Sequence, residues 1–250
     1  MSQQHIVASY DAELSRLNQL IAEMGGLAES QLATAVDALS RRDSKLAANV
    51  VAQDARVDAL ENEVDGFAVR LLALRQPMAS DLRNIVGSIR IAADLERIAD
   101  YAANVAKRTI ALNQNAPVEP ARAIPRMSRL VAAMIKDVLD AYVDRDIAKA
   151  VDVWGRDIEV DDAYSSLFRE LLTYMMEDPR NITVCTHLLF IAKNIERIGD
   201  HITNIAETIH YSVSGERLVQ ARPKTDETAF TTHAGSSPTA APAAAEPKDL

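Results

Sequence analysis

The chain has 250 residues, of which 48% are hydrophobic and 4% aromatic, with 27 Lys and Arg against 36 Asp and Glu. The formal net charge of −9 repels phosphate backbones, and no concentrated basic run offsets it, so direct nucleic-acid binding is disfavoured. Gly and Pro are few, and Ala, Leu, Ile and charged residues dominate the chain. This composition predicts an all-α protein that is long enough to bury a real core.

Apolar residues in the first half recur at intervals of three and four, which is the period of a helix. They predict helices around residues 14–28, 57–74 and 91–105, and Pro77 ends the second. Gly25-Gly26 lies inside the first helical pattern, where each Gly costs about 1 kcal/mol relative to Ala. This pair indicates either a kink or a place where two helices approach closely.

The pattern restarts after a turn-rich segment, NQNAPVEP, which predicts a linker at residues 113–120. Helices are expected around residues 130–141, 153–174 and 191–209, and Asp178-Pro179 ends the second of them. From about Arg222 onward the periodicity vanishes. We therefore expect residues 222–250 to be a disordered tail.

The two halves repeat each other. Residues 91–106 and 191–206, compared at a fixed shift of one hundred positions, are identical at eight of sixteen positions. A weaker echo joins DARVD at 54–58 to DIEVD at 157–161. The sequence therefore predicts an internal duplication of a three-helix bundle, with domains at residues 1–115 and 121–215.

Each copy of the repeat carries acids spaced four residues apart, followed by an Asn (Asn104 and Asn204). Like charges at this spacing repel across one helical turn. Periodicity places the acids of the last helix in each half on the face opposite the core, and those of the middle helices beside the apolar stripe. The acids on the last helices are Glu96, Asp100, Glu196 and Asp200, and those on the middle helices are Asp54, Asp58, Asp157 and Asp161.

With a cation bound between them, the repelling carboxylates would become its ligands, because carboxylate oxygens suit Mg²⁺, Mn²⁺ and iron. One alternative is a passive scaffold with ordinary solubilising charge and no metal. It is weakened because the acids recur while nearby residues change, as Tyr101 does to His201. A second alternative is a ferritin-like di-iron centre, which needs two inward E-x-x-H motifs. Only Glu207-Thr-Ile-His210 matches, without a counterpart at 107–110.

Catalytic signatures are missing from the sequence. There is no G-x-S-x-G, no phosphate-binding glycine loop and no H-E-x-x-H, so no enzyme is predicted. The stretch MSQQHIVASYDAEL lacks the features of a signal peptide, and no apolar run approaches the ~20 residues needed to cross a bilayer. We expect a cytoplasmic protein that reaches a membrane only indirectly, through its partners.

Four segments carry a family resemblance: RLLALRQPMASDLR (70–83), LERIAD (95–100), YMMEDPRNI (174–182) and IERIGDHITNIAE (195–207). Together with the duplication, they resemble the PhoU family in matching order over residues 10–214. The resemblance implies two three-helix bundles related by pseudo-two-fold symmetry, whose repeated E(D)-x-x-x-D motifs bind multinuclear metal clusters in some members. By resemblance, the ligand candidates for iron, zinc, manganese or magnesium are Glu96, Asp100, Glu196 and Asp200, followed by Asp54, Asp58, Asp157 and Asp161.

One residue departs from the family pattern. Ala99 stands where the family usually has Gly, as Gly199 does in the second copy. The added methyl group alters helix approach in the first unit only, which argues against equal metal affinity of the two halves.

The resemblance also implies a function. PhoU proteins are negative regulators of the phosphate (Pho) regulon and modulators of phosphate uptake. They are adaptors between the ATPase subunit of the phosphate ABC transporter and the sensor histidine kinase of the regulon, and a homodimer is a further family expectation. The alternative function is a carboxylate-rich metal-binding or iron-storage helical protein.

Overall fold

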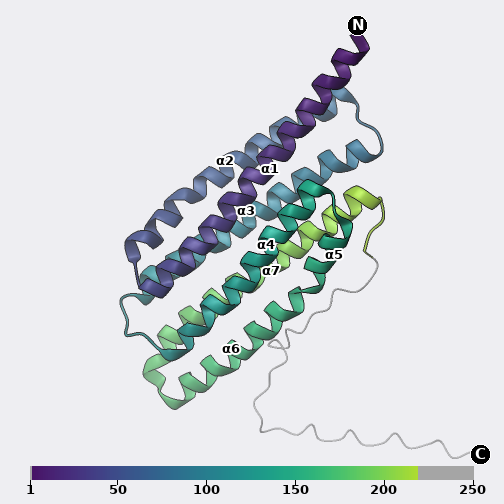
Figure 1. Ribbon diagram of the computed structural model, residues 1–250. Coiled ribbons are helices and arrows are strands. Elements are labelled where there is room, and N and C mark those ends of the chain that lie inside the picture. Colours follow the sequence, from purple (N-terminus) through teal and green to yellow (C-terminus); the bar gives the residue numbers. More distant parts are fainter. Residues whose placement is uncertain (1, 219–250) are drawn as a thin grey trace, which may run out of the picture.

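The computed structural model describes residues 2–218, which form a rod of long helices (Figure 1). The prediction of an all-α protein built from two copies of a three-helix unit is confirmed. The predicted tail at 222–250 lies outside the described residues. The helices are α1 (Ser2–Arg41), α2 (Ser44–Arg75) and α3 (Ser80–Leu112) in the first half, and α4 (Ile124–Asp144), α5 (Ile147–Gly155), α6 (Asp157–Glu177) and α7 (Ile182–Ser214) in the second, with short 3₁₀ turns η1 (Glu119–Ala123) and η2 (Pro179–Asn181).

Local sequence signals set several of the helix ends. Asp43 begins α2, because its carboxylate accepts hydrogen bonds from the backbone N–H groups of Lys45 and Leu46. Gln76 adopts a left-handed conformation (φ 47°) just before Pro77, and α2 ends there. These turns fold α2 back along α1, and α3 back along α2.

The middle helix of the second half is interrupted, which the sequence did not predict. The expected helix at 153–174 is divided between α5 and α6 at Arg156. The backbone N–H of Arg156 donates to the carbonyls of Asp152 and Val153, and its guanidinium lies 2.6 Å from the Asp137 carboxylate on α4. The prediction of one continuous helix is wrong because the apolar period continues across the break and so gives no sign of the interruption at Arg156, whose side chain contacts α4.

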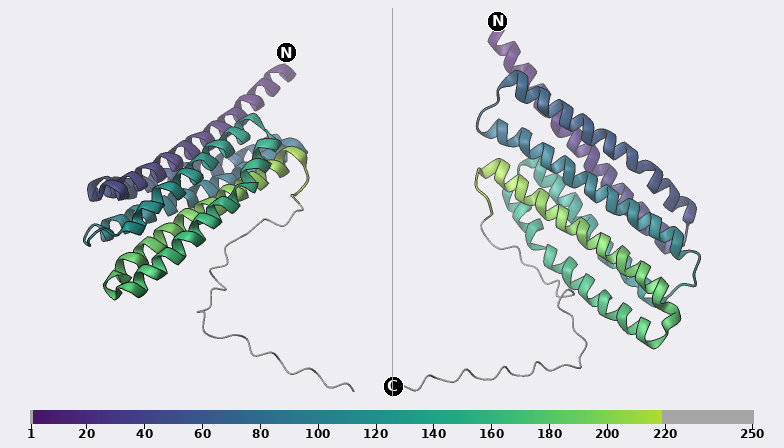
Figure 2. Two further views of the ribbon diagram at one scale, coloured as in Figure 1. Left: turned by 60° about the horizontal axis from the view of Figure 1, so that its bottom comes forward. Right: turned by 180° about the vertical axis from the view of Figure 1, so that it is seen from behind.

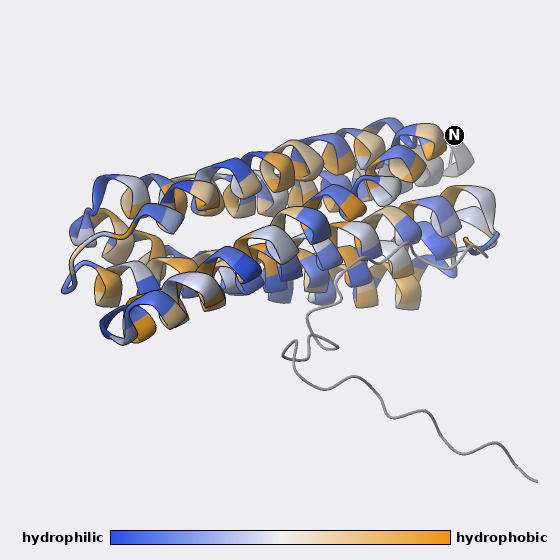
Figure 3. Cartoon of the chain, turned by 90° about the horizontal axis from the view of Figure 1, so that it is seen from below, coloured by the Kyte–Doolittle hydropathy of each residue, from blue (hydrophilic) through white to orange (hydrophobic). Residues whose placement is uncertain are grey.

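Buried aliphatic residues fill the interior of both halves, and polar and apolar residues alternate along each helix (Figure 3). The Gly25-Gly26 pair does not break α1, which runs unbroken to Arg41. A Cβ built on Gly25 would overlap Cδ2 of Leu139, whereas one on Gly26 would meet nothing within 4 Å. Gly25 therefore marks a close approach between α1 and α4.

The two halves meet along α3 and α7, which lie side by side (Figure 2). Three contacts show that these helices are antiparallel. Arg83 Nε lies 3.4 Å from the Ser212 carbonyl, Asp94 Oδ1 lies 2.7 Å from His201 Nδ1, and the Arg108 guanidinium lies 4.0 Å from the centre of the Phe190 ring. We call this contact between α3 and α7 the seam. Among the residues that the structure describes, no helix is long and apolar enough to span a bilayer.

Candidate functional site

The first half gathers acids from α2 and α3, which we call the first acidic cluster: Asp54, Asp58, Glu61, Glu96 and Asp100. Their charges interact across the two helices. Partial burial, and then the charges of Asp100 and Asp58, raise the pKa of Asp54. Partial burial and the charge of Asp100 likewise raise the pKa of Glu96, with smaller contributions from Glu61 and Asp58. The predicted acids of α2 and α3 therefore lie close enough to repel one another.

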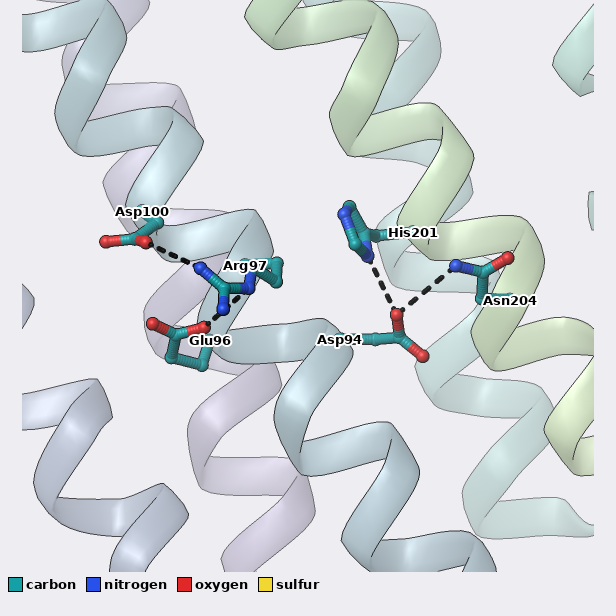
Figure 4. A network of polar contacts seen from close by, with 6 residues as sticks. All are labelled: Asp94, Glu96, Arg97, Asp100, His201 and Asn204. Carbon is teal, nitrogen blue, oxygen red and sulfur yellow. Dashed lines mark hydrogen bonds and ion pairs between the residues drawn. The ribbon is translucent and has the colours of Figure 1, made fainter.

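Arg97 lies on the outer edge of this cluster. Its Nε is 3.4 Å from Glu96 Oε2 and its Nη1 is 3.5 Å from Asp100 Oδ2, and its side chain is 58% exposed. Figure 4 shows that Glu96 and Asp100 project from one side of α3, whereas Asp94 projects toward α7 on the other. The acids of the cluster and the acid of the seam are thus separate features of the same helix.

The second half gathers Asp157 and Asp161 of α6 with Glu196 and Asp200 of α7, which we call the second acidic cluster. Asp157, Asp161 and Glu196 are only 1%, 2% and 4% exposed. The prediction that Glu196 lies on an outward face is wrong. Because α3, α4, α5 and α6 all pack against α7, little of its surface remains open.

Gly199 allows α6 to lie close to α7 at this cluster. A Cβ at this position would lie 3.1 Å from Oδ1 of Asp157 and 3.4 Å from Cγ1 of Val160. The first half has the buried Ala99 at the equivalent place. The difference between Ala99 and Gly199 noted in the sequence therefore coincides with the deeper burial of the second cluster.

Lys193 enters the second acidic cluster, and the sequence reasoning missed it. Its Nζ lies 2.9 Å from Oε1 of Glu196 and 4.9 Å from the centre of the Tyr164 ring. Burial raises the pKa of Glu196 most strongly, the hydrogen bond from Lys193 opposes that shift, and the charge of Asp200 adds to it. The repeat could have revealed Lys193. The equivalent residue one hundred positions earlier is Ala93, so the second copy has a lysine beside its acids where the first copy has none.

Two carboxylate oxygens in the clusters are buried without a hydrogen-bond partner in the protein: Oδ1 of Asp54 and Oε2 of Glu196. Buried oxygens of this kind are costly unless a donor or a cation satisfies them, and carboxylate oxygens are ligands that hard metal ions prefer. Among the side chains that the structure describes, however, no group of three or more from His, Cys, Asp and Glu is placed to hold one.

Several other residues singled out in the sequence have different roles. The side-chain amide of Asn204 donates to Asp94 over 3.4 Å and so belongs to the seam. Glu207 accepts a hydrogen bond from the Trp154 indole over 2.9 Å, and His210 Nδ1 lies 2.9 Å from the Glu216 carbonyl oxygen. The single E-x-x-H match is therefore engaged elsewhere.

Comparisons with known proteins agree with this architecture. The PhoU domain family model matches residues 21–109 and 124–209. Two proteins named "phosphate-specific transport system accessory protein PhoU homolog" are each 53% identical to this chain: that of Caulobacter vibrioides over 224 residues (89% of this chain, 97% of the relative) and that of Rhizobium meliloti over 229 residues (91% and 97%).

A solved structure of a PhoU protein also resembles this chain in sequence and in fold. The crystal structure of PhoU from Pseudomonas aeruginosa is 40% identical, has a TM-score of 0.80, and covers 83% of this chain and 100% of its own. The family consists of non-enzymatic accessory proteins, which confirms the prediction that this protein is not an enzyme. With a PhoU domain in each half and relatives of this identity matched over nearly their whole length, the chain belongs to the PhoU family.

Proposed function

We propose that this protein is a cytoplasmic adaptor and negative regulator of the phosphate (Pho) regulon that modulates phosphate uptake. It links the ATPase subunit of the phosphate ABC transporter to the phosphate-sensing histidine kinase, and it forms a homodimer. The observation that carries the proposal is the match of both halves to relatives named as accessories of the phosphate-specific transport system. Phosphate-replete cells would hold the kinase inactive through this complex.

Both ends of the rod expose apolar side chains, which supports contact with two partners. At the turn between α2 and α3, Leu74 is 72% and Met78 is 81% exposed. At the turn between α6 and α7, at the opposite end of the rod, Met176 is 78% and Ile182 is 48% exposed (Figure 1). Exposed apolar side chains of this size commonly serve as anchors in protein interfaces.

Gene deletion tests the regulatory role. Deletion should derepress phosphate-starvation genes in phosphate-rich medium, as measured with a reporter, and a plasmid copy of the gene should restore repression. Unchanged reporter expression in the deletion strain would contradict the proposal.

The two ends can be tested separately. Tagged wild-type protein should capture both the transporter ATPase subunit and the kinase in phosphate-rich cells. Met78→Asp should weaken capture of one partner and Met176→Asp capture of the other, so that each variant is the control for its counterpart. Full capture of both partners by both variants would show that the ends are not the contact sites.

We further propose that the acidic clusters bind metal ions (iron, zinc, manganese or magnesium), which would supply positive charge between the paired helices. Glu96 with Asp100, and Glu196 with Asp200, would be the main ligands, assisted by the middle-helix acids Asp54, Asp58, Asp157 and Asp161. The buried unpartnered oxygens of Asp54 and Glu196 support this.

Elemental analysis tests metal binding. Glu96→Ala combined with Glu196→Ala should lower the metal content of purified protein. An unchanged metal content would show that these acids do not bind metal and serve only as ordinary charged side chains. Oxygen-dependent turnover of added Fe²⁺ would instead favour the iron-storage alternative.

A further inference from the structure

The first and middle helices of the two halves are joined in different ways. In the first half, three ion pairs connect α1 to α2. Their nitrogen–oxygen distances are 3.0, 3.0 and 2.7 Å, and the pairs are Arg16–Glu63, Arg56–Glu23 and Arg75–Glu13. In each pair, the opposite charges of the two helices meet directly. The α1–α2 contact is therefore closed at its surface.

The surface between α4 and α6, the corresponding helices of the second half, is hollowed. Two adjoining hollows of about 430 and 320 Å³ lie along these helices and share Arg126, Leu130 and Glu159. We call them together the α4–α6 groove. The groove extends along the chain from Ala123 to Met134, which corresponds to about 16 Å or three helical turns.

The lining of the groove between its edges is apolar or small. Met127, Met134 and Leu167 are at most 2% exposed, and Leu130 is half-buried. The small residues of the lining are Ala123, Ala133, Ala163 and Ser166. Methionine side chains adapt to irregular apolar surfaces, and small side chains allow another backbone to come close.

Opposite charges line the two edges of the α4–α6 groove. Arg126 and Arg129 lie on the α4 edge, whereas the α6 edge carries the acids Glu159, Asp162 and Glu170. All five residues are exposed, and none forms an ion pair within 4.0 Å among the side chains that the structure describes. The groove therefore keeps complementary charges apart, whereas the first half joins such charges.

These features favour a helix as the occupant of the groove. The backbone groups along α4 and α6 are bonded within their own helices, so an extended peptide would find no backbone partners there. A helix satisfies its own backbone groups and offers an apolar stripe between two polar flanks. The acidic edge disfavours a nucleic acid.

We propose that the α4–α6 groove binds an amphipathic helix of a partner protein, with an apolar stripe about three turns long, acidic residues along one flank and basic residues along the other. The apolar stripe packs over Leu130, the acidic flank pairs with Arg126 and Arg129, and the basic flank pairs with the acids of the α6 edge. This surface is separate from the apolar side chains at the rod ends, so the inference goes beyond the proposed function.

Fluorescently labelled helical peptides of about 18 residues test the groove, with anisotropy as the readout and the full-length protein as the binder. Three peptides share a leucine stripe and carry Glu on one flank and Lys on the other, Glu on both flanks, or Lys on both flanks. Wild type should bind the mixed peptide roughly tenfold more tightly than either of the others, because a like-charged flank is repelled by one edge. Equal affinities, or no binding of the mixed peptide, would overturn the proposal.

Charge reversal in the protein provides the matched control. Arg126→Glu with Arg129→Glu makes both edges acidic and should transfer the preference to the Lys-flanked peptide. Adding Glu159→Lys, Asp162→Lys and Glu170→Lys exchanges the two edges and should restore the preference for the mixed peptide, because a helix can lie in the groove in either direction. Circular dichroism verifies folding, and if the fivefold variant fails to fold, the double variant decides. An unchanged preference in the folded variants would show that the peptides bind elsewhere.

Photo-crosslinking in cells identifies the natural occupant. The photoreactive residue p-benzoylphenylalanine is placed at Leu130 in the groove and, as a control, at Val69 on α2, which is 60% exposed. Mass spectrometry of the product specific to position 130 should identify a segment of another protein with the expected apolar stripe and two oppositely charged flanks. A product with a second copy of this chain, with residues 219–250 or with a segment that lacks this pattern would overturn the proposal, as would the absence of a specific product.

Discussion

The two halves carry the same acidic motif in different surroundings. In the first half, Asp58 is exposed and the Glu96 side chain retains 18% exposure, so solvent can screen the repulsion between the acids. In the second half, Asp157 and Asp161 are almost fully buried, and Lys193 supplies a compensating charge. The comparison teaches that burial and neighbouring residues, rather than the four-residue spacing, determine how strongly the carboxylates of the two clusters repel one another.

The largest expected change in the free energy of unfolding comes from core substitutions that test whether the two halves unfold together. Ile98→Ala and Ile198→Ala remove equivalent, fully buried side chains, and each should lower the free energy of unfolding by about 2–5 kcal/mol. Trp154, the only tryptophan, reports on the second half, whereas circular dichroism reports on both. Because the seam joins the halves, both signals should shift together in a denaturant titration. If the tryptophan transition stays in place in Ile98→Ala, the halves unfold independently.

A smaller loss of stability is expected from a substitution that tests the close approach of α6 to α7 at Gly199. In Gly199→Ala, the new methyl group would crowd the Asp157 carboxylate and Val160, and we expect a loss of about 1–3 kcal/mol by thermal or chemical unfolding. The matched change, Ala99→Gly, should cost about 1 kcal/mol through helix propensity alone. A neutral Gly199→Ala would mean that α6 and α7 separate there at no cost.

A smaller effect is expected at the seam. Asp94→Ala removes the partner of His201, whose Nδ1 lies 2.7 Å from the carboxylate in a contact where both side chains are less than a quarter exposed. The free energy of unfolding should fall by about 1 kcal/mol, and Asp94→Asn, which keeps an acceptor, should lose less. Equal losses in the two variants would show that the charge of Asp94, and not its hydrogen bond, stabilises the seam.

The smallest effect concerns the pH dependence of the metal-free protein. Burial and the charge of Asp100 raise the pKa of Glu96, so its protonated form is favoured on folding. Its stabilising contribution is present below the pKa of the unfolded chain and is lost as the pH rises through the higher pKa of the folded state. In the presence of a chelator, Glu96→Gln should therefore raise stability by about 0.5 kcal/mol at neutral pH.

The same change should have little effect near pH 4, where Glu96 is largely protonated. Melting temperatures at the two pH values provide the measurement. Glu196→Gln is the contrasting variant, because it removes the partner of Lys193 and should not stabilise. A higher melting temperature for Glu196→Gln would show that the ion pair with Lys193 does not stabilise the second cluster.

Periodicity and the repeat were sufficient to predict the helices, the duplication and the identity of the acids. They did not reveal the break at Arg156, because the apolar period runs through it while a contact with Asp137 on another helix favours the turn. The burial of Glu196 was missed because a helical projection gives each helix one core-facing side, whereas α7 is covered by four other helices. The ion pair of Lys193 depends on the position of Tyr164 on a neighbouring helix, which spacing along one helix cannot show.

The antiparallel seam has a consequence for the origin of the chain. Two copies of one unit meet there through the same helix in each, which is the arrangement of a two-fold symmetric dimer interface contained within a single polypeptide. A gene encoding one unit alone would leave the seam face of α3, including Gly87, uncovered and in need of a second copy. Fusion of two such genes makes that pairing intramolecular and independent of protein concentration, and afterwards each copy can change separately.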